Sequence, residues 1–344
     1  MDVGITGAPG AGRTTVFRAL LAHRAPARTG ARAAGSAIGA IHVQDPRLGQ
    51  LAGKFRPQKV TPIEIRLHDL CNSLEPSFPT AEVQAMKRME VLLLVLDGFA
   101  DPSPDTALQR FREILGELVL EDLAGVERRL ERAVREPLEA SERDALEAAR
   151  ESLESEQPVR SAEMTAAARK ALRSYALLTD RPLIAVLNTA EDRASKPVPP
   201  DLERTAAGCG IPVLSICAAL EAEMADLDPE DQPALLAEYG IGAPAGGELT
   251  RAVLAISDIV PFFTVGEDEC RAWGIPRGTR ARSAAGRIHS DIERGFIRAE
   301  VIPFDDLLPL QGGLVEARKL GLLRLEGKDY PVQDGDIVHF RFNV

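Results

Sequence analysis

Residues 7–15 of the chain read Gly7-Ala8-Pro9-Gly10-Ala11-Gly12-Arg13-Thr14-Thr15. Phosphate-binding loops follow the pattern G-x-x-x-x-G-K-[S/T]. Gly7, Gly12 and Thr14 occupy the positions that this pattern fixes, and Arg13 stands where the pattern has lysine. The apolar residues 3–6 before the loop are typical of a buried parallel strand, and residues 15–21 after it have the apolar spacing of a helix.

A strand, a glycine-rich loop and a helix in this order place consecutive backbone N–H groups and a helix N-terminus around a phosphate. We therefore expect the loop to bind a nucleotide, and Thr14 to place its hydroxyl on Mg²⁺. The expected nucleotide-binding residues of the loop are Gly7, Pro9, Gly10, Ala11, Gly12, Arg13, Thr14 and Thr15. The alternative is an ordinary glycine-rich turn, and the position between a strand and a helix favours the phosphate loop.

Length, charge and cysteine usage narrow the class of protein. A chain of 344 residues can hold two or three domains, and 45% hydrophobic with 27% charged residues is an ordinary soluble composition. The net charge of -11 means that any nucleic-acid contact needs a local basic patch. With no apolar run of membrane-spanning length and no room for a signal peptide before Gly7, we expect a cytoplasmic protein without a membrane span. The scattered Cys and His residues predict no structural zinc.

Four further segments predict a parallel sheet covered on both faces. They are residues 63–68, 91–96, 183–187 and 211–218. Polar residues follow several of these short apolar runs, and ligands in such sheets bind beyond the carboxyl ends of the strands. Gly7, Asp69 and Asn188 should therefore share one edge. Residues 25–39, rich in Ala, Gly and Arg, predict a loop.

The remaining chain divides into an insertion and a C-terminal module. Apolar residues three and four apart between about 106 and 176 predict an antiparallel helical hairpin whose second helix opens at Pro137. Its charges favour a solvated face over an arm for a partner. Short strand-like runs with glycine turns from residue 259 onward predict a small α+β domain. The expected boundaries are 1–104 with 177–258 for an α/β nucleotide-binding domain, 105–176 for the insertion and 259–344 for the module.

Two further motifs lie at the predicted sheet edge. Asp69-Leu70-Cys71-Asn72 occupies the place of a D-x-x-G motif, in which the aspartate holds Mg²⁺ through water. Asn188-Thr189-Ala190-Glu191 occupies the place of the guanine-reading N-K-x-D motif, and it has neither that lysine nor that aspartate. Guanine selectivity should therefore be poor. Residues 215–220 fit the loop that closes over a base, with Cys217, Ala218 and Ala219 as the expected contacts.

The chain resembles the YchF/Obg-like ATPase family over nearly its whole length. Asn188 and Glu191 match the N-x-x-E motif of that family, and residues 44–48 approximate its P-D-P-R-L element. The strongest similarity lies in residues 284–302, 325–330 and 332–336, which look like the family's TGS module, a ubiquitin-like β-grasp domain. The resemblance implies a P-loop domain with a helical insertion, a preference for ATP over GTP, and association with the ribosome.

Four departures fall on the catalytic parts of that pattern. Arg13 replaces the loop lysine, residues 30–44 contain no threonine for the first switch, Asn72 replaces the switch glycine, and the second switch from Ser73 to Thr80 is short. Phosphoryl transfer depends on positioning and charge stabilisation. We therefore expect weak or lost hydrolysis, with Mg²⁺ still held by Thr14 and Asp69. A protein that only binds RNA or the ribosome and has no NTPase activity is the alternative.

Seven arginines lie within residues 271–298, which contain only Asp291 and Glu293 as acids. On an acidic chain this is a local basic patch suited to rRNA or tRNA phosphates. The alternative is that arginine stems cover the surface of a small domain. The expected RNA or ribosome contacts are Arg280, Arg282, Arg287 and Arg298.

Overall fold

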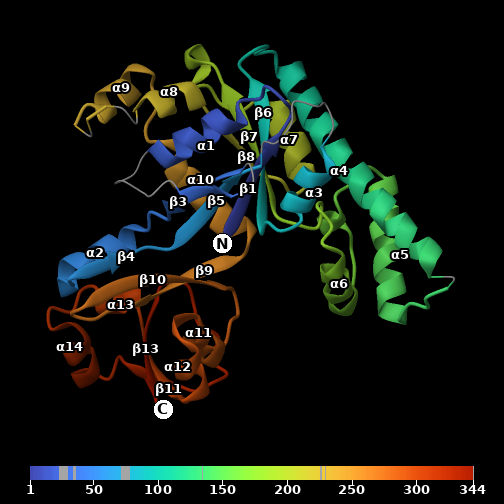
Figure 1. Cartoon of the computed structure of the whole chain (residues 1–344). Coiled ribbons are helices and arrows are strands. Elements are labelled where there is room, and N and C mark those ends of the chain that lie inside the picture. Colours follow the sequence, from blue (N-terminus) through green and yellow to red (C-terminus); the bar gives the residue numbers. More distant parts are fainter. Residues whose placement is uncertain are drawn as a thin grey trace. The chain divides into compact units, whose positions relative to one another are not determined.

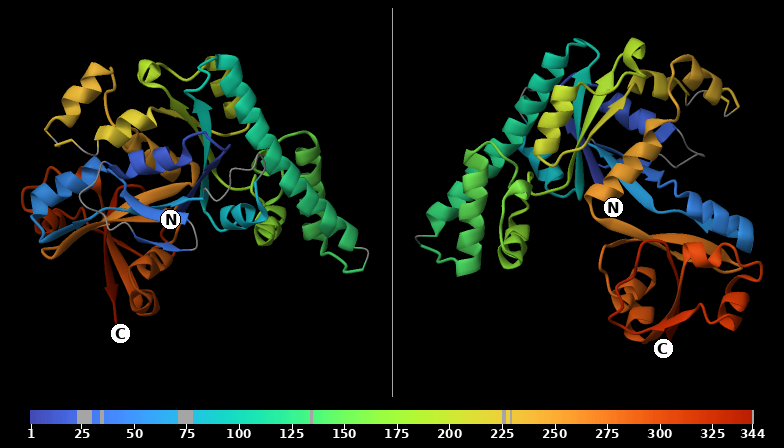
Figure 2. Two further views of the ribbon diagram at one scale, coloured as in Figure 1. Left: turned by 45° about the horizontal axis from the view of Figure 1, so that its top comes forward. Right: turned by 180° about the vertical axis from the view of Figure 1, so that it is seen from behind.

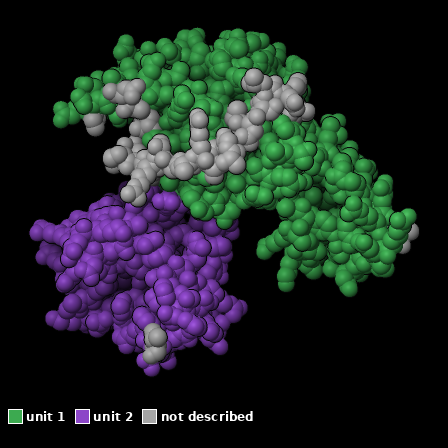
Figure 3. All heavy atoms as spheres, in the orientation of Figure 1, with its two compact units in different colours: residues 1–41, 65–252 green, residues 42–64, 253–344 purple. Residues whose placement is uncertain are grey.

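The computed structural model describes residues 1–22, 30–33, 36–70, 78–133, 135–224, 227–228 and 230–343. These residues form two compact units, each built from two separate parts of the chain. Unit 1 contains residues 1–41 and 65–252, and unit 2 contains residues 42–64 and 253–344 (Figure 3). In the described part of the chain no helix has the length and apolar character needed to cross a membrane.

Unit 1 is built on a seven-stranded sheet with the order β2-β3-β5-β1-β6-β7-β8. The strands are β1 (Asp2–Gly7), β2 (Gly30–Ala33), β3 (Ser36–His42), β5 (Glu64–Asp69), β6 (Val91–Gly98), β7 (Leu183–Thr189) and β8 (Val213–Ile216). The pairs of β1 with β5 and β6, of β6 with β7, and of β7 with β8 are parallel, as the sequence predicts. All of β6 and β7 is buried, because both faces of the central strands are covered.

Helices cover both faces of this sheet (Figure 1). Figure 1 shows α1 and α8 on one side, and α3, α4 and α7 on the other. The helices of unit 1 are α1 (Arg13–Ala22), α3 (Thr80–Met86), α4 (Pro104–Arg132), α5 (Ala140–Glu154), α6 (Ala166–Leu172), α7 (Pro200–Gly208), α8 (Ala218–Glu223), α9 (Gln232–Glu238) and α10 (Ala245–Ile256). Short 3-10 turns lie at Val159–Ser161, Arg173–Tyr175 and Glu191–Arg193.

The predicted insertion lies between β6 and β7 and consists of α4, α5 and α6. The views in Figure 2 show α4 and α5 packed side by side and continuing beyond the sheet. Helix α4 buries Phe111, Leu115 and Leu118, which have the predicted spacing. Helix α5 begins at Ala140 rather than at Pro137. The carboxylate of Asp122 on α4 accepts hydrogen bonds from the backbone nitrogens of Leu178 and Thr179, at 2.8 and 2.7 Å.

Residues 25–39 were expected to form a loop. In their described part the structure has strand β2 and most of β3, which pair antiparallel at one side of the sheet. An Ala- and Gly-rich segment has a weak strand signal of its own, and pairing with a neighbouring strand supplies what the local sequence lacks. The predicted changes at Asn72 and in the second switch fall mostly on residues 71–77, which lie outside the described residues.

Unit 2 is built on a mixed six-stranded sheet with the order β12-β11-β13-β9-β10-β4. Its elements are α2 (Pro46–Phe55), β4 (Lys59–Thr61), β9 (Ile259–Thr264), β10 (Glu269–Pro276), α11 (Ala281–Ile288), α12 (Ser290–Arg294), β11 (Phe296–Pro303), α13 (Phe304–Leu307), α14 (Gly313–Lys319), β12 (Arg324–Glu326) and β13 (Asp336–Phe342). Four of the short apolar runs that look strand-like in the sequence after residue 259 are not strands. Ile288 and Leu307 end helices, Leu322 and Leu323 precede β12, and residues 330–332 lie between β12 and β13.

Each face of this second sheet has its own apolar core. One core lies under α11 and α12 and includes Phe262, Ile275 and Val301. The other lies under α2, α13 and α14 and includes Leu51, Phe263 and Ile302. The expected boundaries placed residues 42–64 in the nucleotide-binding domain, whereas the structure places them in unit 2. The reason is that α2 covers one of these cores and β4 pairs with β10 to form one edge of this sheet.

Arg47 fixes the start of α2. Asp45 caps the helix by accepting a hydrogen bond from the backbone nitrogen of Arg47 at 2.9 Å. The guanidinium of Arg47 forms ion pairs with Asp45 and Asp334, both at 2.8 Å, and lies over the ring of Phe263. The element that resembles P-D-P-R-L therefore fastens α2 to the C-terminal sheet.

Candidate functional site

The loop after β1 has the backbone geometry of a phosphate cradle. Gly7, Gly10 and Gly12 have φ angles of 146°, 82° and 82°, which favour glycine. The loop leads into α1, where the backbone nitrogen of Val16 donates to the carbonyl of Gly12 at 2.8 Å. The backbone N–H groups that begin this helix have no helical carbonyl to bond to, so they are available to an anion.

Two side chains from the sheet edge meet this loop. The Thr14 hydroxyl donates to Asp69 Oδ2 at 2.8 Å, and Asp69 ends β5 beside β1. The Asn188 amide nitrogen donates to the Ala11 carbonyl at 3.1 Å, and its oxygen accepts from the Ala218 nitrogen at 3.2 Å. Asn188 therefore braces the loop against the start of α8. A Cβ at Gly12 would lie 2.3 Å from the Asn188 nitrogen, so this close approach requires glycine.

Thr14 and Asp69 form a donor set that suits Mg²⁺. A hydroxyl and a carboxylate are hard oxygen ligands, and Mg²⁺ in phosphate sites is held by one or two carboxylates together with phosphates and waters. Asp69 is 6% exposed and lies in hydrogen-bonding contact with Thr14. These two residues fit the metal, and a bound Mg²⁺ would neutralise phosphate charge beside the loop.

A cavity of about 640 Å³ opens beside the loop. Its lining residues come from the loop, from the carboxyl ends of β6 and β7 and from α8, and they are Gly12, Thr15, Phe99, Asn188, Thr189, Ala190, Glu191, Asp192 and Ala219. Drug-sized and nucleotide-sized ligands occupy cavities of roughly 300–1,000 Å³. The cavity lies where ligands bind in parallel α/β sheets, outside the carboxyl ends of the strands.

The structure brings together part of the predicted nucleotide set. Gly12, Thr15, Asn188, Glu191 and Ala219 line the cavity. Cys217 and Ala218 are 2% and 0% exposed and do not belong to its lining residues. Burial raises the pKa of the Cys217 thiol. The Tyr239 hydroxyl lies 3.5 Å from Glu191 Oε2, and the charge of Glu191 raises the pKa of Tyr239.

Sequence reasoning missed Phe99. Its ring is 40% exposed and lines the cavity, just after the carboxyl end of β6. The preceding Asp97 holds this turn by accepting hydrogen bonds from the backbone nitrogens of Phe99 and Ala100, both at 3.0 Å. The sequence did contain a signal for Phe99. Asp97 and Phe99 follow the continuous apolar run 91–96, at the carboxyl edge of the predicted sheet where ligands bind.

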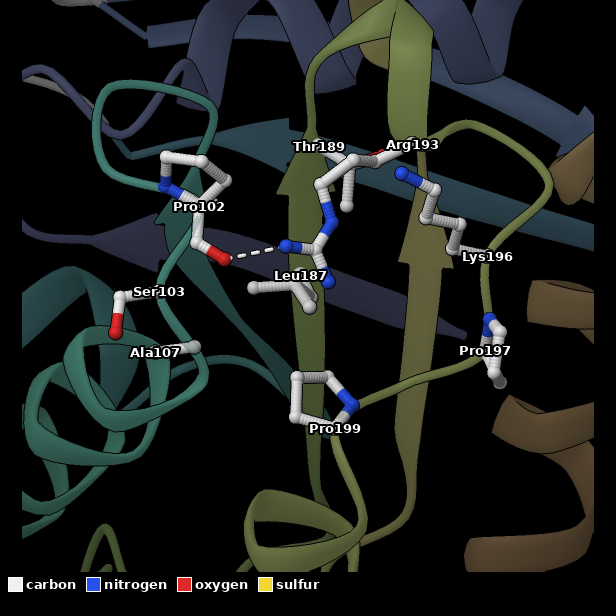
Figure 4. A pocket seen from close by; sticks show the side chains of 10 residues that line it. Pro102, Ser103, Ala107, Leu187, Thr189, Arg193, Lys196, Pro197 and Pro199 are labelled. Atoms are coloured by element: carbon white, nitrogen blue, oxygen red, sulfur yellow. Dashed lines mark hydrogen bonds between the residues drawn. The ribbon is translucent and has the colours of Figure 1, made fainter.

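A second hollow separates the loops after β6 and β7 (Figure 4). Arg193 donates a hydrogen bond to the Pro102 carbonyl across it, and Lys196 and Pro199 complete its wall. Its volume of about 10 Å³ holds about one water. This hollow is therefore too small for a ligand, and the Arg193 contact links the two loops that carry Phe99 and Glu191.

Arg13 does not line the cavity. Its Nη1 donates to Glu82 Oε1 at 3.1 Å, and the two side chains are 4% and 1% exposed. Glu82 lies on α3, so the residue at the lysine position of the loop is directed to a buried carboxylate of the protein.

The four arginines expected to contact RNA lie on two faces of unit 2. Arg280, Arg282 and Arg287 belong to α11 or its cap and cover one face of the sheet. Arg298 is on β11 directly opposite Arg341 of β13, on the other face. Arg280 pairs with Asp329 at 2.6 Å, whereas Arg287 and Arg298 have no ion pair among the described residues.

A cluster that the sequence did not indicate lies next to Arg298 on β11 and β13. Glu300, 5% exposed, accepts hydrogen bonds from Arg318 and Arg341, and His339 lies opposite it on β13. Arg318 and Arg341 are more than half exposed, at 61% and 51%. Arg318 and Arg341 thus pair with the same carboxylate, and Arg341 lies directly opposite Arg298.

These features define a class: an α/β protein with a phosphate loop, a ligand cavity at the carboxyl edge of its parallel sheet, and a second α/β unit. The family YchF-GTPase_C, described as "Protein of unknown function (DUF933)", matches residues 259–343. The chain is 32% identical to the "Ribosome-binding ATPase YchF" of Bacillus subtilis, with all of both chains covered (100%), and 32% identical to that of Escherichia coli O157:H7, with 99% of each covered.

The chain therefore belongs to the YchF family. The structure of the Schizosaccharomyces pombe YchF GTPase is similar to it, with a TM-score of 0.87 and 23% identity. That similarity covers 99% of this chain and 97% of the other, and it shows the same fold over the whole length.

Proposed function

We propose that this chain binds ATP in preference to GTP at the phosphate loop and the adjoining cavity, and hydrolyses it slowly. The observation that carries the proposal is the continuity of the loop with the cavity through Gly12 and Thr15. The backbone N–H groups of the loop and the start of α1 would hold the phosphates. Thr14 and Asp69 would hold Mg²⁺.

The cavity walls support an adenine nucleotide. Phe99 offers an exposed ring for stacking on a base, and Glu191 offers a carboxylate that can accept from an amino group. Glu191 is one methylene longer than the aspartate that reads guanine, and the neighbouring position holds Thr189 instead of lysine. These replacements remove the contacts that select guanine, while stacking suits any base.

A titration separates this proposal from a protein that has lost nucleotide binding. Purified chain is titrated with fluorescent ATP and GTP analogues, with and without Mg²⁺, and phosphate release is measured. We expect saturable ATP binding that Mg²⁺ strengthens. Phe99→Ala should weaken it about fivefold, since stacking contributes about 1 kcal/mol. Absence of binding to the folded wild type would end the nucleotide proposal and leave the RNA-binding alternative.

The relatives are named ribosome-binding, and we propose that this chain contacts ribosomal RNA through unit 2. Arg287 and Arg298 support this, because both are exposed and have no carboxylate partner among the described residues. Arg298 and Arg341 also face each other across two strands, and like charges in that position destabilise a sheet unless an anion is shared.

Ribosome co-sedimentation tests this contact. Arg298→Gln combined with Arg287→Gln should weaken binding and reduce its dependence on salt concentration, because each lost phosphate contact lowers the number of released counterions. Arg204→Gln is the matched control, since Arg204 is an exposed arginine of unit 1. Equal binding by the wild type and the double variant would contradict the assignment of these residues.

A further inference from the structure

A buried carboxylate lies beside the phosphate loop. Glu82 is 1% exposed and accepts hydrogen bonds at Oε1 from Thr6 Oγ1 at 2.7 Å and from Arg13 Nη1 at 3.1 Å. Thr6 is 0% exposed on β1, immediately before the loop. Glu82 thus contacts both the strand that enters the loop and the residue at the lysine position of the motif.

This contact changes the charge that the loop offers to a ligand. In the phosphate-loop motif the cation at this position reaches the β- and γ-phosphates, while backbone N–H groups cradle the α- and β-phosphates. The Arg13 guanidinium is matched instead by a carboxylate of the protein, and both groups are shielded from water. The backbone part of the cradle is untouched by this pairing.

We propose that Glu82 is a specificity-determining residue of this site: by holding Arg13, it withholds the loop's positive charge from the terminal phosphate. The inference rests on the proposed nucleotide function and assigns its phosphate preference. The site then distinguishes poorly between a nucleoside triphosphate and a diphosphate, because both present the same α- and β-phosphates to the backbone cradle.

The burial of the pair makes the arrangement persistent. If Arg13 turned to a phosphate, Glu82 would lose its cationic partner in a site that is 1% exposed, and removing one partner of a buried ion pair is strongly destabilising. Burial raises the pKa of Glu82, and Thr6 and Arg13 act against that rise. Arg13 is therefore part of what allows a carboxylate to lie there.

The test compares ATP, ADP and adenosine, as fluorescent analogues, on the wild type and on Glu82→Gln. Glutamine keeps the size of the side chain and a carbonyl oxygen that can accept from Thr6, and it removes the negative charge. We expect the affinity for ATP to rise roughly tenfold, the affinity for ADP to rise less, and that for adenosine to stay the same, since the variant removes the negative charge that Glu82 sets against Arg13. Damage to the fold would weaken all three ligands together.

Two further variants test whether the gain in ATP affinity comes from Arg13. In Arg13→Gln/Glu82→Gln the extra ATP affinity should disappear. Glu117→Gln removes a partly buried carboxylate of α4 near Glu82, and it should give no gain. If Glu82→Gln does not fold by circular dichroism, Glu82→Asp, which shortens the side chain and weakens the pair, should shift the preference toward ATP in the same direction.

The outcomes separate the two proposals. If the wild type binds ATP and ADP and Glu82→Gln changes both equally or neither, Glu82 does not set the preference and only this inference fails. A gain that persists in the double variant overturns it as well. Failure of every folded protein to bind either nucleotide ends the proposed function, and the inference with it.

Discussion

The two glycines Gly7 and Gly10 show how differently single positions of one loop are constrained. Gly7 has a φ of 146°, and a Cβ there would lie 2.3 Å from the backbone carbonyl oxygen of Val95. Gly10 has a φ of 82°, and no atom of the described residues lies within 4 Å of the same position. A side chain at position 7 would therefore cause both backbone strain and a clash with the central strand β6. A side chain at position 10 would cause backbone strain alone.

We predict that Gly7→Ala lowers the free energy of unfolding by roughly 3 kcal/mol or more, and Gly10→Ala by roughly 1 kcal/mol. Urea denaturation followed by circular dichroism measures both. Equal losses at the two positions would show that the close approach of Gly7 to Val95 is relieved by a small shift of the loop.

The positions of individual site residues could be predicted from the sequence where the phosphate-loop motif and the parallel strands determine the backbone. The φ angles of the loop, the Thr14–Asp69 contact and the shared edge of Asp69 and Asn188 follow from a strand–loop–helix and from strands whose carboxyl ends coincide. The Arg13–Glu82 pair was not predictable, because it depends on α3 packing beside the loop, 69 residues away in sequence. No local pattern marks Glu82 as a partner.

Helix α4 is held to the segment before β7 by one buried carboxylate. Asp122, 1% exposed, accepts from the backbone nitrogens of Leu178 and Thr179 and from the Thr179 hydroxyl. Burial raises the pKa of Asp122 to about 6 from an ordinary value of 3.8, although the three donors act in the opposite direction. Over the interval between these values the folded chain binds more protons than the unfolded chain, so raising the pH favours unfolding.

We predict that the free energy of unfolding of the wild type, measured relative to Asp122→Asn, falls by about 3 kcal/mol as the pH rises through this interval and is constant above it. Urea unfolding at a series of pH values, with each protein compared at the same pH, gives this difference. A difference that rises with pH would mean that the donors lower the pKa of Asp122 below its ordinary value.

Elements were predictable where their periodicity was strong. The continuous apolar runs of β6 and β7 and the three- and four-residue spacing in α4 gave the central sheet and the insertion. The strands β2 and β3 were missed, because Ala- and Gly-rich segments form strands only through pairing with neighbours. The sequence pattern also did not reveal which sheet β4 joins, because this depends on pairing with β10, a strand that is distant in sequence.

At the level of the whole molecule, the chain order does not follow the division into units. Residues 42–64 leave unit 1, contribute α2 and β4 to unit 2, and the chain then returns to unit 1 at β5. Leu51 of α2 is 0% exposed and shares a core with Phe263 and Ile302 of the C-terminal sheet. The stability of the C-terminal unit therefore depends on a segment some 200 residues earlier in the sequence.

The single tryptophan of the chain, Trp273, lies on β10 and reports on unit 2. We predict that Leu51→Ala lowers the unfolding free energy reported by Trp273 fluorescence by about 3 kcal/mol, because it leaves a cavity in that core. Leu67→Ala is the matched control: Leu67 is also 0% exposed but lies on β5 of unit 1, so it should shift the circular dichroism transition and leave the Trp273 midpoint in place. The reverse pattern would mean that residues 42–64 fold with unit 1.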